Sequence, residues 1–194
     1  MFSDTVRLRR TNQLAARVWI VIVNYRTAEL VLDCLHSIAG QIAEFPEIHT
    51  VVVDNASGDG SVEKLMRTVD LEGWRSWVAV LPLDRNGGFA FGNNAGIREA
   101  LRSTCHVDYV MLLNPDTIAH RGAVRSLVDF MDSHERVGIA GSLLENIQGA
   151  AECSAHNAPS PFGELASGAR LGLLSRILDR YVVTPPLREV APRC

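Results

Sequence analysis

Short runs of β-branched and apolar residues alternate along this chain with stretches of helical spacing, and this alternation limits the possible folds most strongly. Each run is continuous and bounded by turn residues, which is typical of strands buried on both faces of a parallel sheet. The runs predict strands at Val18–Val23, His49–Asp54, Trp77–Pro82 and Asp108–Leu113, with a fifth at Val137–Leu144.

Helical spacing of apolar residues fills the intervals between these runs. The predicted helices are Thr27–Gly40, Ser61–Asp70, Phe89–Thr104 and Ala123–His134. Thr27 and Ser61 have the side chains expected of N-caps for the first two helices. Alternation of strand and helix favours βαβ units and a parallel sheet with helices on both faces. The expected fold class is therefore α/β.

Length and composition restrict the class of protein. A chain of 194 residues with 47% hydrophobic and 21% charged residues is typical of one soluble globular domain. Its net charge of -3 provides no basic field that would attract nucleic acid. Cys34, Cys105, Cys153 and Cys194 form no CxxC pair, which favours free thiols in a reducing cytosol. The N-terminus has no apolar segment of the kind that forms a secretory signal.

The chain divides into three regions. Residues 1–17 form a basic arm, residues 18–147 carry the strand and helix pattern, and residues 148–194 contain a loop, an amphipathic helix and a tail. The expected helix, Leu165–Tyr181, has a broad apolar face with Arg176 and Arg180 near its edge. That face could lie on a membrane surface or pack against another part of a larger protein.

Polar residues follow each of the first four strands. These strand ends read Asn24-Tyr25, Asp54-Asn55, Arg85-Asn86-Gly87-Gly88 and Asn114-Pro115-Asp116. The carboxyl ends of parallel strands share one edge of a sheet, and ligands of open α/β sheets bind there. The sequence therefore predicts a binding site at this edge.

Two of these strand ends carry a carboxylate, and each has two interpretations. Asp116, on a rigid strand end beside a proline, suits a divalent cation such as Mg²⁺, which takes oxygen ligands and phosphate oxygens. Alternatively, Asp116 caps a helix after Thr117 or closes an Asx-turn with its side chain. Asp54 can accept a hydrogen bond from a nucleobase N–H or a ribose hydroxyl, or it can form a turn in "DNASGDGS".

The stretch "NGGFAFGNNAGI" places small residues at intervals of four. Gly88, Gly92 and Gly96 would line one helix face, against which a ligand could pack, or the helix could simply lie close to the sheet. The spacing does not meet the GxGxxG fingerprint of dinucleotide-binding folds. Asn93 and Asn94 are poor helix formers, so we expect them to contact a sugar or phosphate.

Four of these motifs together resemble a known family. In order and spacing, "VIVNYRT", "VVVDNASGDGS", "NGGFAFGNNAGI" and "VMLLNPDT" resemble the N-terminal half of inverting family-2 glycosyltransferases with the GT-A fold, and in particular the bacterial rhamnosyltransferase-like branch. The resemblance covers residues 18–145. It implies a Rossmann-like, three-layer sandwich with a mostly parallel central sheet, and a core at residues 18–147 that binds a nucleotide-sugar.

The resemblance also implies roles for individual residues. Asp116 occupies the place of a metal ligand in the family's DxD motif and would bind Mg²⁺ or Mn²⁺, with Asn114 replacing the first Asp. Asp54 would meet the base of a nucleoside-diphosphate-sugar donor. The other donor-binding residues implied are Asn24, Tyr25, Asn55, Arg85, Asn86, Gly88, Asn93, Asn94 and Asn114.

The implied reaction is a direct, inverting displacement. An acceptor hydroxyl attacks the anomeric carbon, a base takes its proton, and the metal stabilises the departing nucleoside diphosphate. dTDP-rhamnose fits the branch as donor, and a glycan or lipid-linked molecule as acceptor, in cell-wall or polysaccharide biosynthesis. The implied location is cytoplasmic, with peripheral contact at the inner face of the membrane.

The chain departs from the family in one respect. Family members carry their acceptor site and general base in a second half, often as an acidic pair, and no Glu-Asp pair occurs here. Residues 148–194 would be the start of that acceptor region. Glu145, Glu152, Glu164 and Asp179 are candidates for the base by residue type alone. The alternatives are a truncated, non-catalytic nucleotide-sugar-binding domain and a doubly wound domain with another nucleotide ligand.

Overall fold

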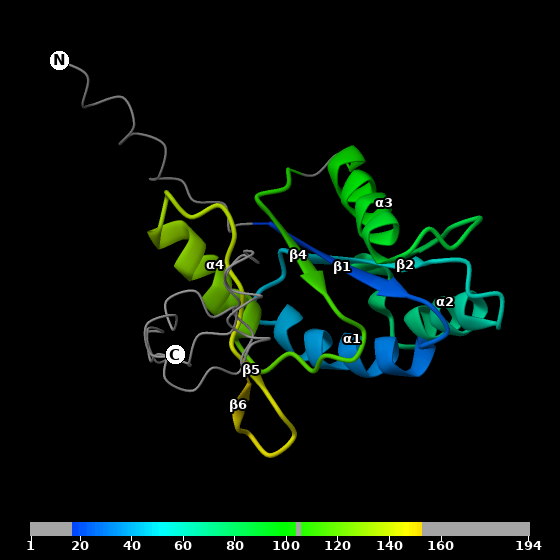
Figure 1. The fold of residues 1–194 in the computed structure, drawn as a ribbon, viewed down its shortest axis with the longest axis horizontal. Helices are drawn as coiled ribbons and strands as arrows, with labels where there is room; N and C mark the ends of the chain where they lie inside the picture. Colours follow the sequence, from blue (N-terminus) through cyan, green and yellow to red (C-terminus); the bar gives the residue numbers. More distant parts are fainter. Residues whose placement is uncertain (1–16, 104–105, 153–194) are drawn as a thin grey trace, which may run out of the picture. The chain divides into compact units, whose positions relative to one another are not determined.

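A sheet of four parallel strands forms the centre of the fold (Figure 1). The strands are β1 (Val18–Asn24), β2 (Ile48–Asp54), β3 (Val78–Pro82) and β4 (Tyr109–Leu113), in the spatial order β3-β2-β1-β4. Neighbours pair in parallel register, so that Asn24 lies beside Asp54 and Ile22 beside Leu113. The parallel sheet predicted from the sequence is confirmed, and the boundaries of its strands shift by at most one residue.

The computed structural model describes residues 17–103 and 106–152. It divides into two structural units, Met1–Val128 and Asp129–Cys194. The parallel sheet lies in the first unit. The basic arm up to residue 16 and the expected helix Leu165–Tyr181 lie outside the described residues.

Helices cover both faces of the sheet, as predicted (Figure 1). On one face, α1 (Ala28–Ile42) and α2 (Ser61–Leu71) bury alternate residues of β1, including Ile20 and Ile22. On the other face, α3 (Phe89–Arg102) covers Val21, Val51 and Val53. Because successive side chains of a strand point to opposite faces, continuous valine and isoleucine runs suit a strand buried on both sides. The fold is therefore a three-layer α/β sandwich.

α3 approaches the sheet closely because two of its residues lack a side chain. A Cβ atom at Gly96 would lie 2.5 Å from Val21 Cγ1, and one at Gly92 would lie 2.7 Å from Val23 Cγ1. Gly88 lies outside the helix, at the N-cap, with φ +84°. Of the two interpretations of the glycine spacing, close helix–sheet packing is the one found at Gly92 and Gly96.

The beginnings of α1 and α2 differ from expectation. Thr27 occupies the N-cap position of α1, but its hydroxyl makes no capping bond and donates instead to Asn24 Oδ1 at 3.1 Å. The prediction that Ser61 caps α2 was wrong, because Gly60 is the N-cap, with φ +86°. Ser61 is the first helical residue, and its N–H and hydroxyl both donate to Asp59 Oδ1.

The chain after β4 contains α4 (Ala123–Ser133), followed by a two-stranded antiparallel ribbon of β5 (Leu144–Glu145) and β6 (Ala151–Glu152). The predicted strand Val137–Leu144 was wrong, since only its last residue pairs. Gly138 and Gly141 interrupt this run, and glycine weakens a strand interior. A short 3₁₀ turn, η2 (Trp74–Ser76), precedes β3.

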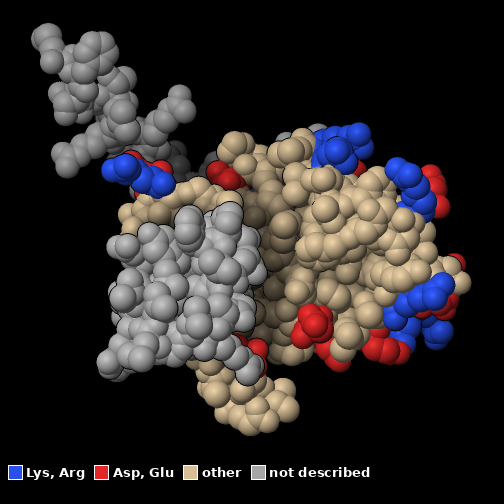
Figure 2. All heavy atoms as spheres, viewed as in Figure 1, with Lys and Arg blue, Asp and Glu red and all other residues tan. Residues whose placement is uncertain are grey.

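Charged side chains of both signs are interspersed on the face shown in Figure 2, and neither sign forms a continuous field there. This distribution agrees with the small net charge of -3. Within residues 17–103 and 106–152, no helix combines the length and the apolar character needed to cross a membrane.

Candidate functional site

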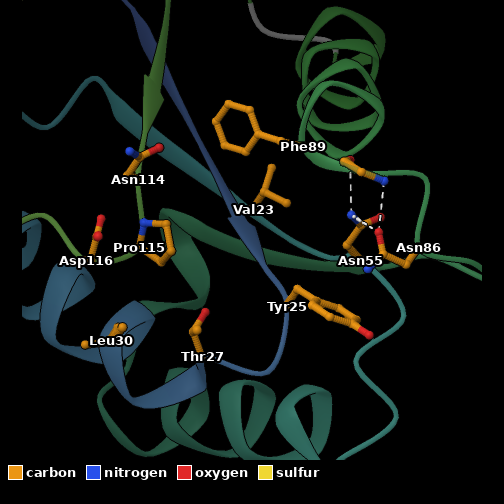
Figure 3. Close-up of a pocket in the computed structure, with 11 residues that line it drawn as sticks. Val23, Tyr25, Thr27, Leu30, Asn55, Asn86, Phe89, Asn114, Pro115 and Asp116 are labelled. Carbon is orange, nitrogen blue, oxygen red and sulfur yellow. Dashed lines mark hydrogen bonds between the residues drawn. The ribbon is translucent and has the colours of Figure 1, made fainter.

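A pocket of about 420 Å³ lies at the carboxyl ends of the four parallel strands (Figure 3). Its size is within the range of small-ligand sites. The convergence of strand ends predicted from the sequence is therefore confirmed. The lining residues are Val23, Tyr25, Thr27, Leu30, Asn55, Asn86, Gly88, Phe89, Asn114, Pro115 and Asp116.

The pocket has two polar sides separated by an apolar centre (Figure 3). Tyr25, Asn55 and Asn86 lie on one side, and the Asn114-Pro115-Asp116 turn lies on the other, with Val23 between them. This arrangement follows from the strand order, because β1 lies between β2 and β4. An elongated ligand across the sheet edge would therefore contact both polar sides.

Asp54, the last residue of β2, belongs to a buried hydrogen-bond network. Asn24 Nδ2 donates to Asp54 Oδ1 at 2.6 Å, Ser57 Oγ donates to the same oxygen at 2.6 Å, and Ser57 N donates to Asp54 Oδ2 at 3.0 Å. Asp54 is 2% exposed and Asn24 is 0% exposed, and neither lines the pocket. The Asp54 carboxylate thus organises the turn after β2.

This network joins the loop after β1 to the loop after β2. Arg26 N donates to Ser57 Oγ at 2.9 Å, and Arg26 Nε donates to Ser57 O at 3.2 Å. Arg26 and Ala56 both have positive φ, at 60° and 57°, which is unfavourable for residues with a Cβ. The hydrogen bonds to Ser57 hold Arg26 and Ala56 in these unfavourable conformations. The path of both loops, and with it the position of Tyr25, is therefore tightly fixed.

Asn55 holds the loop that follows β3. Its Nδ2 donates to Asn86 Oδ1 at 2.9 Å and to Gly88 O at 3.1 Å, while its Oδ1 accepts from Gly87 N at 3.3 Å. Asn86 Oδ1 also accepts from Gly88 N at 2.9 Å. These bonds occupy both Nδ2 hydrogens of Asn55, whereas Asn86 Nδ2 donates to no other described residue and remains available to a ligand.

The other polar side is open. The side chains of Asn114 and Asp116 line the pocket and form no hydrogen bond with any residue that the structure describes. Asn114 O accepts a bond from Thr117 N at 3.2 Å, and the next helix, α4, begins only at Ala123. The alternative in which Asp116 caps a helix after Thr117 is therefore wrong. Among the described residues nothing occupies the Asp116 carboxylate, in contrast to that of Asp54.

A buried thiol lies next to this turn. Cys34 Sγ, on α1, donates to Asn114 O at 3.9 Å. Burial raises the pKa of the Cys34 thiol to about 12, and the negative charge of Asp116 adds to this effect. The thiol is therefore uncharged near neutral pH. Among the described residues, no three His, Cys, Asp or Glu side chains lie together as a metal site, so Asp116 is not part of a preformed carboxylate cluster.

The remaining residues predicted for the site lie outside the pocket lining. Arg85 is exposed, with its guanidinium 5.1 Å from the centre of the Phe91 ring. Asn93 is buried, and its Nδ2 donates to Phe89 O within the same helix at 3.1 Å. Asn94 is exposed on α3.

Sequence reasoning missed five residues that line the pocket: Val23, Thr27, Leu30, Phe89 and Pro115. Leu30 and Phe89 have apolar side chains, but they are 43% and 57% exposed. The signal that could have found Phe89 is its position directly after the polar, glycine-rich loop that follows β3.

Both the sequence and the fold are similar to those of known proteins. The sequence model described as "Glycosyl transferase family 2" matches residues 19–179. No curated protein sequence gives a match. Among solved structures, the mannosyltransferase PcManGT from Pyrobaculum calidifontis, in complex with GDP-Man and Mn²⁺, has a TM-score of 0.54 and 20% identity over 67% of this chain and 36% of that chain.

A second similar fold is that of residues 1–349 of S. aureus TarS. It has a TM-score of 0.50 and 18% identity over 67% of this chain and 40% of that chain. The same protein in complex with UDP-GlcNAc has a TM-score of 0.50 and 17% identity, over 67% and 38% of the two chains. The chain thus spans between 36% and 40% of the length of these structures, and at such identities the likeness concerns the fold.

Proposed function

Because the chain belongs to glycosyl transferase family 2 and has its α/β, GT-A type of fold, we propose that its pocket binds a nucleoside-diphosphate-sugar and that the sugar is transferred to an acceptor hydroxyl. The observation that carries this proposal is the open Asp116 carboxylate, which lies across the pocket from Tyr25 and Asn86. Such a donor needs a cation for its diphosphate and a surface on which its base can stack. The Asp116 carboxylate can hold the cation, and the Tyr25 ring can meet the base.

The nucleoside would bind on the Tyr25 side of the pocket. The Tyr25 side chain is 41% exposed, so its ring offers a surface on which a base can stack. Asn86 Nδ2, which donates to no other described residue, can donate a hydrogen bond to the base or the ribose. Asn55 and Gly88 shape this side through the hydrogen bonds between them.

The diphosphate would bind on the Asp116 side. Mg²⁺ and Mn²⁺ favour oxygen ligands, and Mg²⁺ is often held by one or two carboxylates together with substrate phosphates. The single carboxylate of Asp116 and the amide oxygen of Asn114 fit this pattern. When bound, the cation would neutralise charge on the departing nucleoside diphosphate. The presence of Mn²⁺ with GDP-Man in the PcManGT structure supports this assignment.

The remaining residues predicted for the site would act differently. We assign Asn24 and Asp54 to holding the two loops around Tyr25, because their polar atoms form hydrogen bonds with one another, with Ser57 and with Thr27. Asn93 holds the first turn of α3. Arg85 and Asn94, which are exposed and outside the pocket lining, would contact only a ligand that extends beyond the pocket.

The finer specificity follows from the motif resemblance. It favours a donor of the dTDP-rhamnose type and a glycan or lipid-linked acceptor, in cell-wall or polysaccharide biosynthesis on the cytoplasmic side of the membrane. If the chain is instead a doubly wound domain with another nucleotide ligand, it should prefer NAD to a diphosphate-sugar. Titration of dTDP-rhamnose, UDP-GlcNAc, GDP-Man and NAD into the protein distinguishes these donors, because only the matching nucleotide should bind at micromolar concentration.

A second candidate function is donor binding without transfer by this chain alone. Among the described residues that line the pocket, Asp116 is the one carboxylate. A carboxylate that binds the cation is not free to take the proton of an acceptor hydroxyl, so the described residues that line the pocket supply no general base.

The two candidates differ in the product formed. Incubation with the bound donor, Mn²⁺ and a membrane or glycan extract, followed by measurement of released nucleoside diphosphate and labelled glycan, separates them. Transfer with a rate that depends on the acceptor supports the glycosyltransferase. Tight donor binding, with nucleoside diphosphate released no faster than from the donor in buffer alone, supports a domain that binds the donor without transferring its sugar.

A further inference from the structure

Three polar side chains on one face of α1 bind the main chain of the segment that follows β4, residues 114–124. Cys34, Ser37 and Gln41 are three and four residues apart, a spacing that places them on one helix face. Their contacts are Cys34 Sγ to Asn114 O at 3.9 Å, Ala119 N to Ser37 Oγ at 3.0 Å and Val124 N to Gln41 Oε1 at 3.4 Å.

Each of these contacts involves a backbone atom of the segment. They therefore fix its path whatever side chains it carries. The Ser37 hydroxyl also donates to Cys34 O at 2.6 Å, which orients its oxygen toward Ala119 N. Gln41 is 3% exposed, so its side chain has little access to water as an alternative partner.

Contacts beyond the end of α1 continue this attachment. Glu44 forms an ion pair with Arg121, which also lowers the pKa of the Glu44 carboxyl. The Arg125 guanidinium lies 4.6 Å from the centre of the Phe45 ring. The segment is therefore held along its length, from the end of β4 to the start of α4.

Asp116 lies between the first two attachments, two residues after Asn114 and three before Ala119. Thr27 and Leu30, at the other end of α1, line the same pocket (Figure 3). We propose that Ser37 and Cys34 are positioning residues for Asp116: by holding the backbone on both sides of this residue, they set where its carboxylate lies and thus how tightly it holds a divalent cation. This inference rests on the function proposed above.

The test uses Ser37→Ala, which removes the acceptor for Ala119 N, and Ser37→Thr, which keeps a hydroxyl. Thr68→Ala is the matched control, because it removes a hydroxyl bonded within a helix, to Lys64 O at 3.0 Å, on the exposed side of α2. Binding of Mn²⁺ is measured by electron paramagnetic resonance of the free ion, in the presence of whichever of UDP, GDP or dTDP the wild-type protein binds.

We expect Ser37→Ala to weaken Mn²⁺ binding about tenfold, the lower range for groups that orient metal ligands. Ser37→Thr should restore the affinity, and Thr68→Ala should leave it unchanged. Hydrogen exchange of the Ala119 amide, measured without nucleotide or metal, should accelerate in Ser37→Ala and remain slow in Thr68→Ala. If Ser37→Ala does not fold, Cys34→Ala and Cys34→Ser provide the same comparison at Asn114, with weaker Mn²⁺ binding expected for Cys34→Ala.

Wild-type Mn²⁺ affinity in folded Ser37→Ala, together with loss of affinity in Asp116→Ala, would overturn the positioning role and leave the proposed function intact. Absence of Mn²⁺ binding by the wild-type protein would overturn the metal site of the proposed function and this inference with it. The two failures are therefore distinguishable.

Discussion

Asn24 and Asp54 end neighbouring strands and meet side by side, with Asn24 Nδ2 donating a hydrogen bond of 2.6 Å to Asp54 Oδ1. With Ser57 they form a buried network that leaves Asp54 2% exposed. Asp116 also follows a buried strand, yet its carboxylate faces the pocket without a hydrogen bond from any described residue. One strand-end carboxylate thus supports the loops, and the other is available to a ligand.

Replacing Asp54 should mainly cost stability. Asp54→Ala removes the acceptor of Ser57 N and of Ser57 Oγ and one of the two acceptors of Asn24 Nδ2, so we expect the free energy of unfolding to fall by about 2–4 kcal/mol. Urea unfolding followed by circular dichroism measures this loss. Asp70→Ala is the matched control, because Asp70 pairs with Arg75 at the surface and its loss should have little effect. Unchanged stability with lost donor binding would mean that Asp54 contacts the donor directly.

Removing the Tyr25 ring should weaken nucleotide binding. A base stacked on an aromatic side chain contributes about 1–3 kcal/mol, so Tyr25→Ala should raise the dissociation constant of the nucleoside diphosphate by about 5- to 160-fold. Tyr25→Phe keeps the ring and should bind nearly as the wild type. Leu71→Ala, at an exposed position outside the pocket, controls for the loss of surface apolar area. Equal affinities in Tyr25→Ala and the wild type would place the base elsewhere.

Adding a methyl group at Gly96 should destabilise the fold. The new Cβ would lie 2.5 Å from Val21 Cγ1 and 3.0 Å from Val53 Cγ2, so α3 must move away from the sheet. Overpacking of this kind costs about 1–3 kcal/mol, which thermal unfolding can detect. Gly40→Ala is the control, because no atom lies within 4 Å of its new Cβ and alanine favours a helix. If Gly96→Ala were as stable as Gly40→Ala, α3 would have to pack less closely against the sheet than described above.

Stability should fall at high pH because of Cys34. Its folded-state pKa is about 12 against a reference of 9.0, so above pH 9 the unfolded chain releases a proton that the folded protein keeps. The stabilising effect is complete below pH 9 and is lost as the pH rises toward 12, at up to about 1.4 kcal/mol per pH unit.

Urea unfolding from pH 8 to 10.5, under reducing conditions, tests this effect. Cys34→Ala should be less stable at pH 8, because it loses buried volume, but its stability should decline less steeply with pH than that of the wild type. Parallel pH profiles for the two proteins would show that the Cys34 thiol titrates normally in the folded state.

The strands could be predicted because their signal is local. The continuous valine and isoleucine runs of β1 and β2 fit only strands covered on both faces, and the polar residues that end them mark the site. The interpretation of Asp54 as a turn residue of "DNASGDGS" is borne out by its bonds from Ser57, three residues away. Its bond from Asn24, which lies 30 residues from Asp54, could not be predicted from the pattern within one segment.

Two other differences between the sequence prediction and the structure also arise from the surroundings that the fold provides. Val137–Leu144 has the composition of a strand, but it contains two glycines and, among the described residues, joins a β-ladder only at Leu144. Leu30 has the apolar side chain expected on the buried face of a helix, but it lies in the first turn of α1 at the sheet edge, where it is 43% exposed and lines the pocket. In both cases the result depends on which neighbours the fold supplies.

The most direct test of the central claim is calorimetric titration of UDP-, GDP- and dTDP-sugars into the wild-type protein and Asp116→Ala, with Mn²⁺ and with EDTA. Asp84→Ala, which replaces an exposed carboxylate outside the pocket lining, is the matched control. We predict that Mn²⁺ strengthens binding of one donor at least about tenfold in the wild type and in Asp84→Ala, but has no effect in Asp116→Ala. Equal strengthening by Mn²⁺ in Asp116→Ala, or no donor binding by the wild type with the metal present, would contradict the account.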